Sequence, residues 1–190
     1  MALASLVALA RFSPRRGLGY GVATVYVELF RNIPSLVVLY LAYFGLPEFG
    51  IRIGNYAIGI GVLVIVIGAY LGESLRGSLQ SIPAGQWEAP LSLGLTRIQT
   101  LRHVILPQMY RRAWPSLTNH LMIVLFGTPL LSVIDVRELT SAAAEINSET
   151  FRPVEVYVYA IVIYLVIGVL FQFAMSRLGK ILFTAPASGR

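Results

Sequence analysis

The sequence contains no cysteine and few charged residues, and both absences narrow its class. Without cysteine, neither a disulfide framework nor a thiolate metal site can form. The two histidines, His103 and His120, have no metal-ligand spacing, so we expect no metal site on this chain. Charged residues make up 13% of the 190 residues and hydrophobic residues 56%, a composition too apolar for a soluble domain of this size. The composition therefore predicts a membrane protein.

Motifs for catalysis are also missing. The phosphate-binding loop G-x-x-x-x-G-K-[ST] does not occur, so ATP hydrolysis by that route would need a separate chain. The apolar segments contain neither a Ser/His pair in a nucleophile motif nor paired aspartates. We therefore expect that the chain is not an enzyme and carries no cofactor of its own.

Four apolar segments are predicted to cross the bilayer. A spanning helix needs roughly 20 apolar residues to cross about 30 Å of hydrocarbon, and residues 156–175 meet this requirement. Residues 56–71, extendable to residue 74, and residues 113–134 are further predicted spans. Residues 33–46 are shorter, so they must recruit the preceding amphipathic stretch or form a short, tilted or interrupted helix. The predicted fold is an all-α, polytopic transmembrane helical bundle with about four full spans.

Two of these spans have internal features. The segment 113–134 carries polar residues on an interior face and a Gly127-Thr128-Pro129 breaker in its second half. Polar residues within a span are candidates for a substrate pathway, or for hydrogen bonds between helices, and both alternatives apply to Asn119 and His120. The span before it contains three glycines that suit close helix packing in lipid: Gly59, Gly61 and Gly68.

The basic residues indicate the orientation of the chain in the membrane. If the loop 76–112 lies inside, twelve Lys and Arg residues fall inside and three outside, so the positive-inside rule places this loop and the C-terminus in the cytoplasm. The basic residues lie between apolar runs rather than along one face, which argues against nucleic-acid binding. The inner residues are Arg11, Arg15, Arg16, Arg31, Arg76, Arg97, Arg102, Arg111, Arg112, Arg177, Lys180 and Arg190, and the outer ones are Arg52, Arg137 and Arg152.

Residues 1–190 are expected to form a single transmembrane domain. Residues 1–12 are apolar but too short to cross, and we expect them to be the remnant of a first helix. Glu73 and Arg76 are three residues apart, so we expect them to pair on one helix face. Residues 137–150 are predicted to form an outer amphipathic helix.

The long cytoplasmic loop has a pattern of its own. Ser81 is expected to cap a helix whose first turn holds Pro83, and Gly94 is expected to end that helix in a left-handed conformation. A second amphipathic segment follows from about Thr96, and Pro107 marks a bend before the next span. The pattern predicts a short helix–turn–helix that contacts a cytosolic partner. One apolar face of its second segment is predicted to hold Ile98, Leu101, Ile105 and Met109.

This loop resembles one in a known family. Glu88-Ala89, Gly94 and Leu106-Pro107 are similar to the E-A-A-x3-G-x9-I-x-L-P loop in permease subunits of ABC importers. The flanking sequences are similar to the polar amino-acid branch, which includes the histidine, glutamine, arginine and glutamate permeases. These flanks are Tyr26-Val-Glu-Leu-Phe-Arg-Asn-Ile-Pro34, Gly72-Glu-Ser-Leu-Arg-Gly77, Gln80-Ser-Ile-Pro-Ala-Gly-Gln86 and Glu138-Leu-Thr140.

The resemblance implies a mechanism and a set of partners. Residues 80–110 would be the coupling loop, in which residues 85–95 dock into a groove on an ABC ATPase subunit that binds ATP and Mg²⁺. Further implied partners are an extracytoplasmic amino-acid-binding protein and a second permease subunit, identical or related, in the cytoplasmic membrane. The residues implied in coupling are Gly85, Gln86, Glu88, Ala89, Gly94, Leu106 and Pro107.

Two positions depart from the family pattern. Pro90 stands where the family usually has a second alanine, and Phe126-Gly127 replaces a Lys-Asp pair, with Thr128 retained beside it. The candidate substrate pathway is therefore Asn119, His120 and Thr128. Two alternatives stay open: an ion-gradient-driven secondary transporter or channel, and a degenerate partner subunit of a heterodimer that does not contact substrate.

Overall fold

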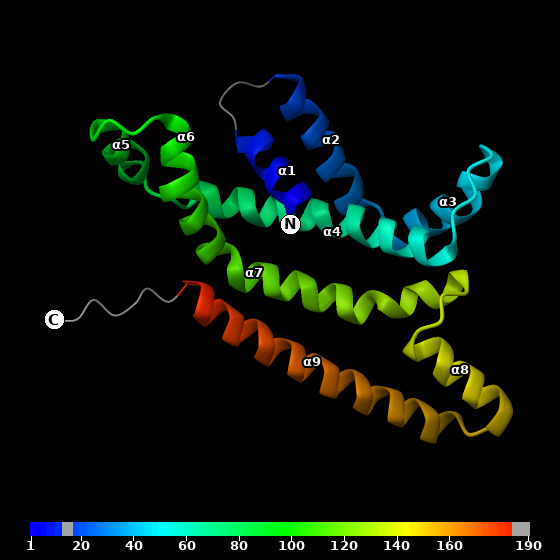
Figure 1. The fold of residues 1–190 in the computed structure, drawn as a ribbon. Coiled ribbons are helices and arrows are strands. Elements are labelled where there is room, and N and C mark those ends of the chain that lie inside the picture. The colour runs from blue at the N-terminus through cyan, green and yellow to red at the C-terminus, as the bar shows by residue number, and fades with distance from the viewer. Residues whose placement is uncertain (13–16, 184–190) are drawn as a thin grey trace.

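The computed structural model describes residues 1–12 and 17–183, and every regular element in these ranges is helical (Figure 1). Arg15, Arg16 and Arg190, which contribute to the predicted inner charge, lie outside the described residues. The α-helices are α1 (Ala2–Phe12), α2 (Leu18–Asn32), α3 (Ser35–Glu48), α4 (Asn55–Gln80), α5 (Gly85–Ser92), α6 (Arg97–Thr100), α7 (Leu106–Gly127), α8 (Leu139–Thr150) and α9 (Pro153–Phe183).

Among the described residues, three helical runs are long and apolar enough to cross a membrane, and a bent pair supplies a fourth if it counts as one span. The three runs are α4, α9 and the segment Arg97–Ile134. The fourth is α2 with α3, which meet at 104°. Pro34 explains the break, because a proline disfavours helical geometry at the residue before it, and Ile33 is extended (φ −102°, ψ 131°). Of the alternatives open for this segment, the structure shows an interrupted helix that includes the preceding stretch.

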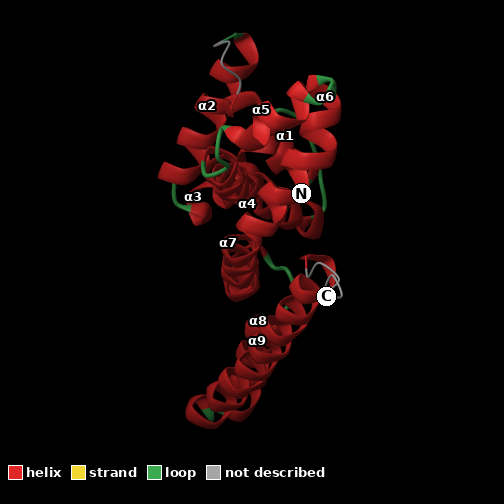
Figure 2. Ribbon diagram, turned by 90° about the vertical axis from the view of Figure 1, so that its left-hand side faces the viewer, coloured by secondary structure: helices red, strands yellow, loops and turns green. Residues whose placement is uncertain are grey.

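Helix α4 is the centre of the bundle. It packs against α1, α2 and α3 on one side and α7 on the other, while α9 lies along α7 and also packs on α8 (Figure 1). Seen from the side, α8 and α9 form an outer layer beyond α7 (Figure 2). The largest apolar core joins α1, α4 and α7 through buried residues such as Leu75, Met109 and Leu117. Most large apolar side chains of α9 are exposed in this single chain, as expected of a helix that faces lipid.

Glycines bring α4 close to its neighbours, largely as predicted. A Cβ at Gly59 would lie 2.9 Å from Leu131, and one at Gly68 would lie 2.7 Å from the Tyr26 hydroxyl. Gly61 has open space instead, so it brings no other helix of this single chain close. The missing side chains at the two close positions let neighbouring helices approach, and such close packing helps to hold helices together in lipid.

Gly72→Ala is expected to destabilise the bundle, and Gly61→Ala is the matched control, which is expected to leave the stability unchanged. A Cβ at position 72 would lie 2.8 Å from Val7 and 3.4 Å from the backbone oxygen of Ala4, so α1 must move outward. Overpacking of this kind costs about 1–3 kcal/mol. We expect a lower midpoint of thermal unfolding in detergent for the first variant only, and an equal midpoint for both would contradict the close α1–α4 packing.

An ion-pair cluster joins α1, α2 and α4. The predicted Glu73–Arg76 pair is confirmed, with an N–O distance of 2.5 Å. Two further arginines approach the same carboxylate from other helices, Arg11 at 2.5 Å and Arg31 at 4.0 Å. Arg11 also lies 3.7 Å from Glu28 of α2. Glu73 therefore links three helices, a role that its spacing from Arg76 did not predict.

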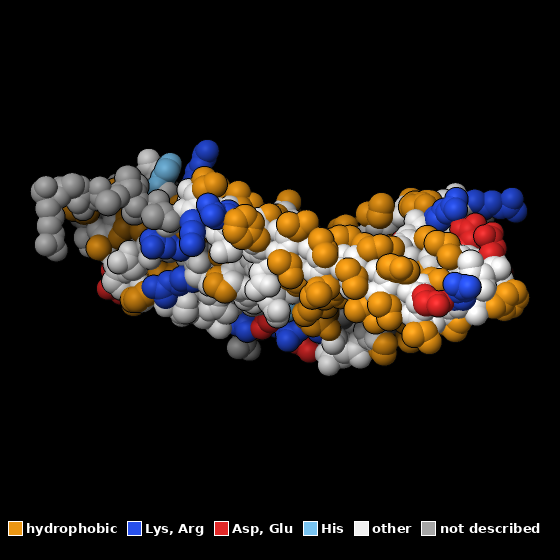
Figure 3. All heavy atoms as spheres, turned by 90° about the horizontal axis from the view of Figure 1, so that it is seen from below, with side chains coloured by type: hydrophobic (Ala, Val, Ile, Leu, Met, Phe, Trp, Pro, Cys, Tyr) orange, Lys and Arg blue, Asp and Glu red, His pale blue; other side chains and the backbone are white. Residues whose placement is uncertain are grey.

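The predicted breaker and the helix over residues 137–150 are both present. Helix α7 ends at Gly127, and a 3₁₀ helix covers Thr128–Ile134 before the left-handed Asp135 (φ 59°). Helix α8 follows, capped by the side chain of Glu138, which accepts hydrogen bonds from two backbone N–H groups of its first turn. Figure 3 shows a group of Lys and Arg side chains toward the end where α5 and α6 lie, and Asp and Glu side chains with further Lys and Arg at the opposite end.

Candidate functional site

Helix α5 projects from the end of the bundle where α4 stops (Figure 1). It carries four of the predicted coupling residues, and all four are exposed: Gly85, Gln86, Glu88 and Ala89. The predicted cap is wrong, because Ser81 follows the last residue of α4 and its hydroxyl donates to the carbonyl of Ser78. The N-cap of α5 is Ala84, without a side-chain hydrogen bond. Ser81 is too far upstream, since Ile82 and Pro83 intervene before the cap.

Gly94 forms the turn after α5, as predicted. Its φ of +87° is in the left-handed region that side chains disfavour. The backbone N–H of Leu95 then bonds back to the carbonyl of Pro90, and that of Gly94 to Leu91. The carbonyl of Pro90 thus takes part in closing the helix, and α5 continues through the proline to Ser92. Pro90 removes one backbone donor without ending the helix.

The second helix of the loop begins at a capping box. The Thr96 hydroxyl accepts from the backbone N–H of Gln99, whose side chain accepts from the N–H of Thr96. The π-helical segment Leu101–Ile105 then connects α6 to α7. Pro107 lies in the first turn of α7. The helical run changes direction between α6 and α7 (Figure 1).

The predicted apolar face of this second helix is partly wrong. Ile105 and Met109 are fully buried and Leu101 is partly buried, but Ile98 is 77% exposed. A π-helical turn holds more residues than an α-helical turn, so it rotates the residues before it away from the face that follows. Ile98 is therefore available to a partner rather than to the core.

Stacking and hydrogen bonds attach this loop to the spans. The Trp87 ring stacks on Phe12 at the end of α1, with centroids 5.5 Å apart and planes 16° apart. The side chain of Gln108 on α7 donates to the side-chain oxygen of Gln86 over 2.9 Å. Leu106, another predicted coupling residue, packs on the core that α1, α4 and α7 share. The loop is thus held by both α1 and α7.

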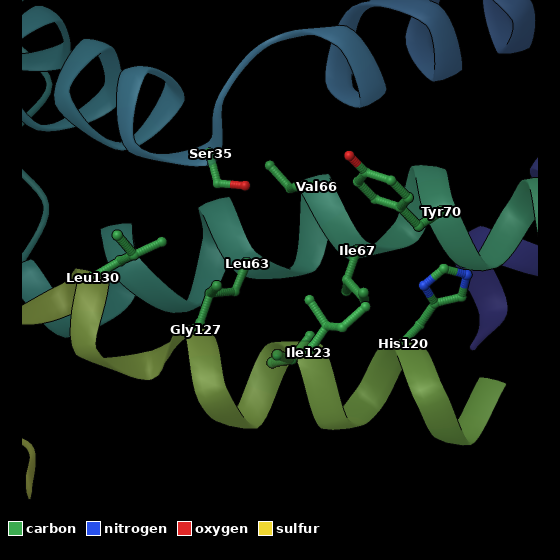
Figure 4. Close-up of a pocket in the computed structure, with 10 residues that line it drawn as sticks. Ser35, Leu63, Val66, Ile67, Tyr70, His120, Ile123, Gly127 and Leu130 are labelled. Carbon is green, nitrogen blue, oxygen red and sulfur yellow. The ribbon is translucent and has the colours of Figure 1, made fainter. Parts of the chain in front are cut away.

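A small cavity lies between α4, α7 and the beginning of α3 (Figure 4). Its volume is about 260 Å³. The Nε2 atom of His120 lies 2.9 Å from the Ser74 hydroxyl, and the His120 ring is 5.7 Å from that of Tyr70. The Tyr70 hydroxyl donates to the carbonyl of Arg31 over 3.3 Å. The lining residues are Ser35, Leu63, Val66, Ile67, Tyr70, His120, Ile123, Val124, Gly127 and Leu130.

One of the three predicted pathway residues lines this cavity. His120 does so, whereas Asn119 is exposed on α7 and is not among the lining residues. Thr128 is also outside the lining, and its hydroxyl donates to the carbonyl of Leu125 over 2.8 Å. Adjacent residues on an α-helix point in different directions, so Asn119 faces away from the cavity that His120 lines. Thr128 belongs to the 3₁₀ segment after α7, where the chain no longer follows the face of that helix.

Two polar lining residues, Ser35 and Tyr70, were not predicted. Ser35 reaches the cavity because the chain breaks at Pro34 and α3 starts beside α4. The sequence feature that could have predicted Ser35 is its position as a polar residue directly after a proline within an apolar segment. Tyr70 lies inside an otherwise apolar span, and its aromatic character gave no reason to separate it from the core.

An all-helical bundle with membrane-length spans, an exposed helix–turn–helix at one end and a cavity between its spans has the architecture of a transporter's transmembrane subunit. The chain belongs to the family of binding-protein-dependent transport system inner membrane components, whose model matches residues 1–182. It is therefore a multi-pass membrane protein of the permease class, and the predicted family and fold are confirmed.

Individual relatives agree with this assignment. The arginine ABC transporter permease protein ArtQ of Haemophilus influenzae is 36% identical over 82% of this chain and 73% of its own length. The glutamine transport system permease protein GlnP of Escherichia coli is 39% identical over 84% of this chain and 74% of its own length. A crystal structure of an amino acid ABC transporter with histidines matches with a TM-score of 0.84 and 34% identity, covering 94% of this chain and 83% of that one. The chain is thus similar to permease subunits of ABC transporters.

Proposed function

We propose that the chain is the membrane-spanning subunit of an ABC importer for polar amino acids. The observation that carries the proposal is the exposed helix–turn–helix around Gly94, because it combines the loop pattern of the family with the predicted left-handed turn. The relatives support the amino-acid class, since they are named as permeases for arginine, glutamine and octopine. ATP and Mg²⁺ bind to a separate ATPase subunit, and an extracytoplasmic binding protein delivers the substrate.

In this proposal α5 docks into the ATPase. Exposed Gln86 and Glu88 supply hydrogen-bonding groups, and the exposed side chains of Leu91, Leu93 and Ile98 supply apolar contact area. An apolar patch with a polar rim is typical of a protein interface. Two permease subunits, identical or related, enclose the translocation path between them, and ATP-driven closure of the ATPases shifts the inward–outward equilibrium.

The contacts of the loop provide a route for this movement into the spans. Motion of α5 is passed to α1 through the Trp87–Phe12 stack and to α7 through the hydrogen bond between their glutamine side chains. Helix α1 is in turn paired with α4 through Arg11 and Glu73. Helices α4 and α7 line the cavity, so the moving elements are also the cavity walls.

Reconstitution with the partner proteins tests the function. The purified chain, its ATPase and its binding protein in proteoliposomes are expected to take up a polar amino acid only when ATP and the binding protein are present. Uptake driven by an ion gradient, or passive leak without ATP, would instead support a gradient-driven transporter or a channel. Normal uptake that survives every change to this chain's cavity would support a degenerate subunit.

The absence of cysteine makes the orientation directly testable. Leu93→Cys and Phe151→Cys introduce single thiols at positions that are 80% and 85% exposed and lie beyond opposite ends of the spans. We expect a membrane-impermeant maleimide added to intact cells to label position 151 but not position 93. The reverse labelling would place the helix–turn–helix outside the cytoplasm and contradict ATPase docking.

A further inference from the structure

Within the part of the chain that the structure describes, the cavity between α3, α4 and α7 is lined without a charged side chain. Its polar groups are the hydroxyls of Ser35 and Tyr70 and the imidazole of His120, and the rest of the lining is aliphatic or glycine (Figure 4). The imidazole already has a partner, because its Nε2 atom lies 2.9 Å from the Ser74 hydroxyl. A ligand in this cavity therefore meets hydrogen-bonding groups but no carboxylate.

The charges beyond the lining do not supply the missing carboxylate. The guanidinium carbon of Arg31 lies 5.8 Å from the centroid of the Tyr70 ring, so a cation stands close to the polar end of the cavity. Glu73, three residues after Tyr70 on α4, is engaged by three arginines at 2.5–4.0 Å. Its negative charge is therefore compensated, and it is not free to pair with a positively charged ligand group.

An unpaired charge on a ligand has a high free-energy cost in a cavity without charged lining residues. Moving an ionic group out of water into apolar surroundings requires a partner of opposite sign, and the attraction rarely exceeds the loss of hydration even when the partner is present. The backbone of an amino acid carries one positive and one negative charge and is neutral as a whole. A guanidinium on the side chain adds a positive charge that no carboxylate of the lining pairs. A carboxylate on the side chain finds only Arg31, which is outside the lining and already lies 4.0 Å from Glu73.

We propose that the cavity admits amino acids whose side chain is uncharged and excludes those with a cationic or anionic side chain. The inference rests on the proposed function, since it assumes that this cavity belongs to the translocation path. The cavity volume of about 260 Å³ is below the roughly 300–1,000 Å³ of sites for drug-sized ligands, which agrees with a small substrate. The chain thus contributes its own filter, separate from the choice that the binding protein makes.

Uptake by the complete transporter gives the first test. ATP-driven uptake of L-glutamine, L-arginine and L-glutamate is measured in proteoliposomes that contain the permease, its ATPase and its binding protein, and the remaining amino acids follow if none of these is carried. We expect the carried substrates to have uncharged side chains, with uptake about tenfold or more above that of arginine and glutamate. Arginine or glutamate carried at a similar or higher rate overturns the inference and leaves the proposed function standing. No ATP-driven uptake of any amino acid overturns the proposed function itself.

A matched pair of variants tests the cavity rather than the binding protein. Ile123 lines the cavity and is 57% exposed in this chain, so its replacement removes little core packing. Ile123→Gln and Ile123→Glu have the same size and differ by one negative charge. We expect Ile123→Gln to keep uptake of the carried, uncharged substrate within about threefold of the unchanged transporter. We expect Ile123→Glu to lower the same uptake by a further factor of about ten, with both variants still co-purifying with the ATPase. Equal uptake by the two variants would show that the cavity does not select against charge.

Discussion

Gly94→Val is expected to abolish capture of the ATPase and to lower ATP-driven uptake at least about tenfold. Gly94 has a φ of +87°, which a β-branched residue adopts only with strain on the order of 1–3 kcal/mol. Relief of that strain would open the turn and separate α5 from α6. The docking surface then loses its shape while the membrane spans keep their packing, because the turn lies outside them.

Gly94→Asn is the matched control for this prediction. Asparagine tolerates the left-handed region better than other side chains, and a Cβ at position 94 meets no atom within 4 Å. We expect the asparagine variant to keep most ATPase capture and uptake, as measured by co-purification and proteoliposome transport. If the valine variant also binds the ATPase normally, the turn is not what presents the docking helix.

The second large effect is expected from Glu73→Gln. The Glu73 carboxylate accepts from Arg11 and Arg76 and lies 4.0 Å from Arg31, and the Arg11 side chain is only 11% exposed. Removing the negative charge takes away the acidic partner of the mostly buried Arg76 and leaves Arg11 only the longer contact to the exposed Glu28. Breaking a buried ion pair in this way costs about 3–5 kcal/mol. We expect a marked fall in the midpoint of thermal unfolding in detergent and a loss of uptake.

The exposed pair Arg137–Glu145 provides the control for the buried cluster. Its N–O distance is 2.9 Å, but the two side chains are 75% and 55% exposed. Exposed ion pairs contribute at most about 1 kcal/mol, so Glu145→Gln is expected to leave the midpoint nearly unchanged. Equal shifts for the two variants would mean that the cluster at Glu73 is solvated and does not join α1, α2 and α4.

The membrane spans could be predicted because their cause is local. A run of apolar residues with the length of the bilayer has one favourable arrangement, and α4 and α9 follow such runs closely. The turn at Gly94 could also be predicted from local sequence, because a glycine often supplies the left-handed residue that ends a helix. The cap predicted at Ser81 was wrong because two residues, Ile82 and Pro83, separate Ser81 from the actual cap of α5, and helix ends depend on such small differences.

The sequence by itself determined that this is a membrane protein, which segments cross the membrane and which loop carries the family pattern. Apolar run length and turn chemistry act between near neighbours, so these features can be predicted without the tertiary structure. Only the tertiary structure decided what those segments build together. It brought Arg11 and Arg31 to Glu73, Phe12 to Trp87, and Tyr70 to His120. These contacts depend on how helices rotate and approach, and a π-helical turn or a proline break changes that rotation for every residue beyond it.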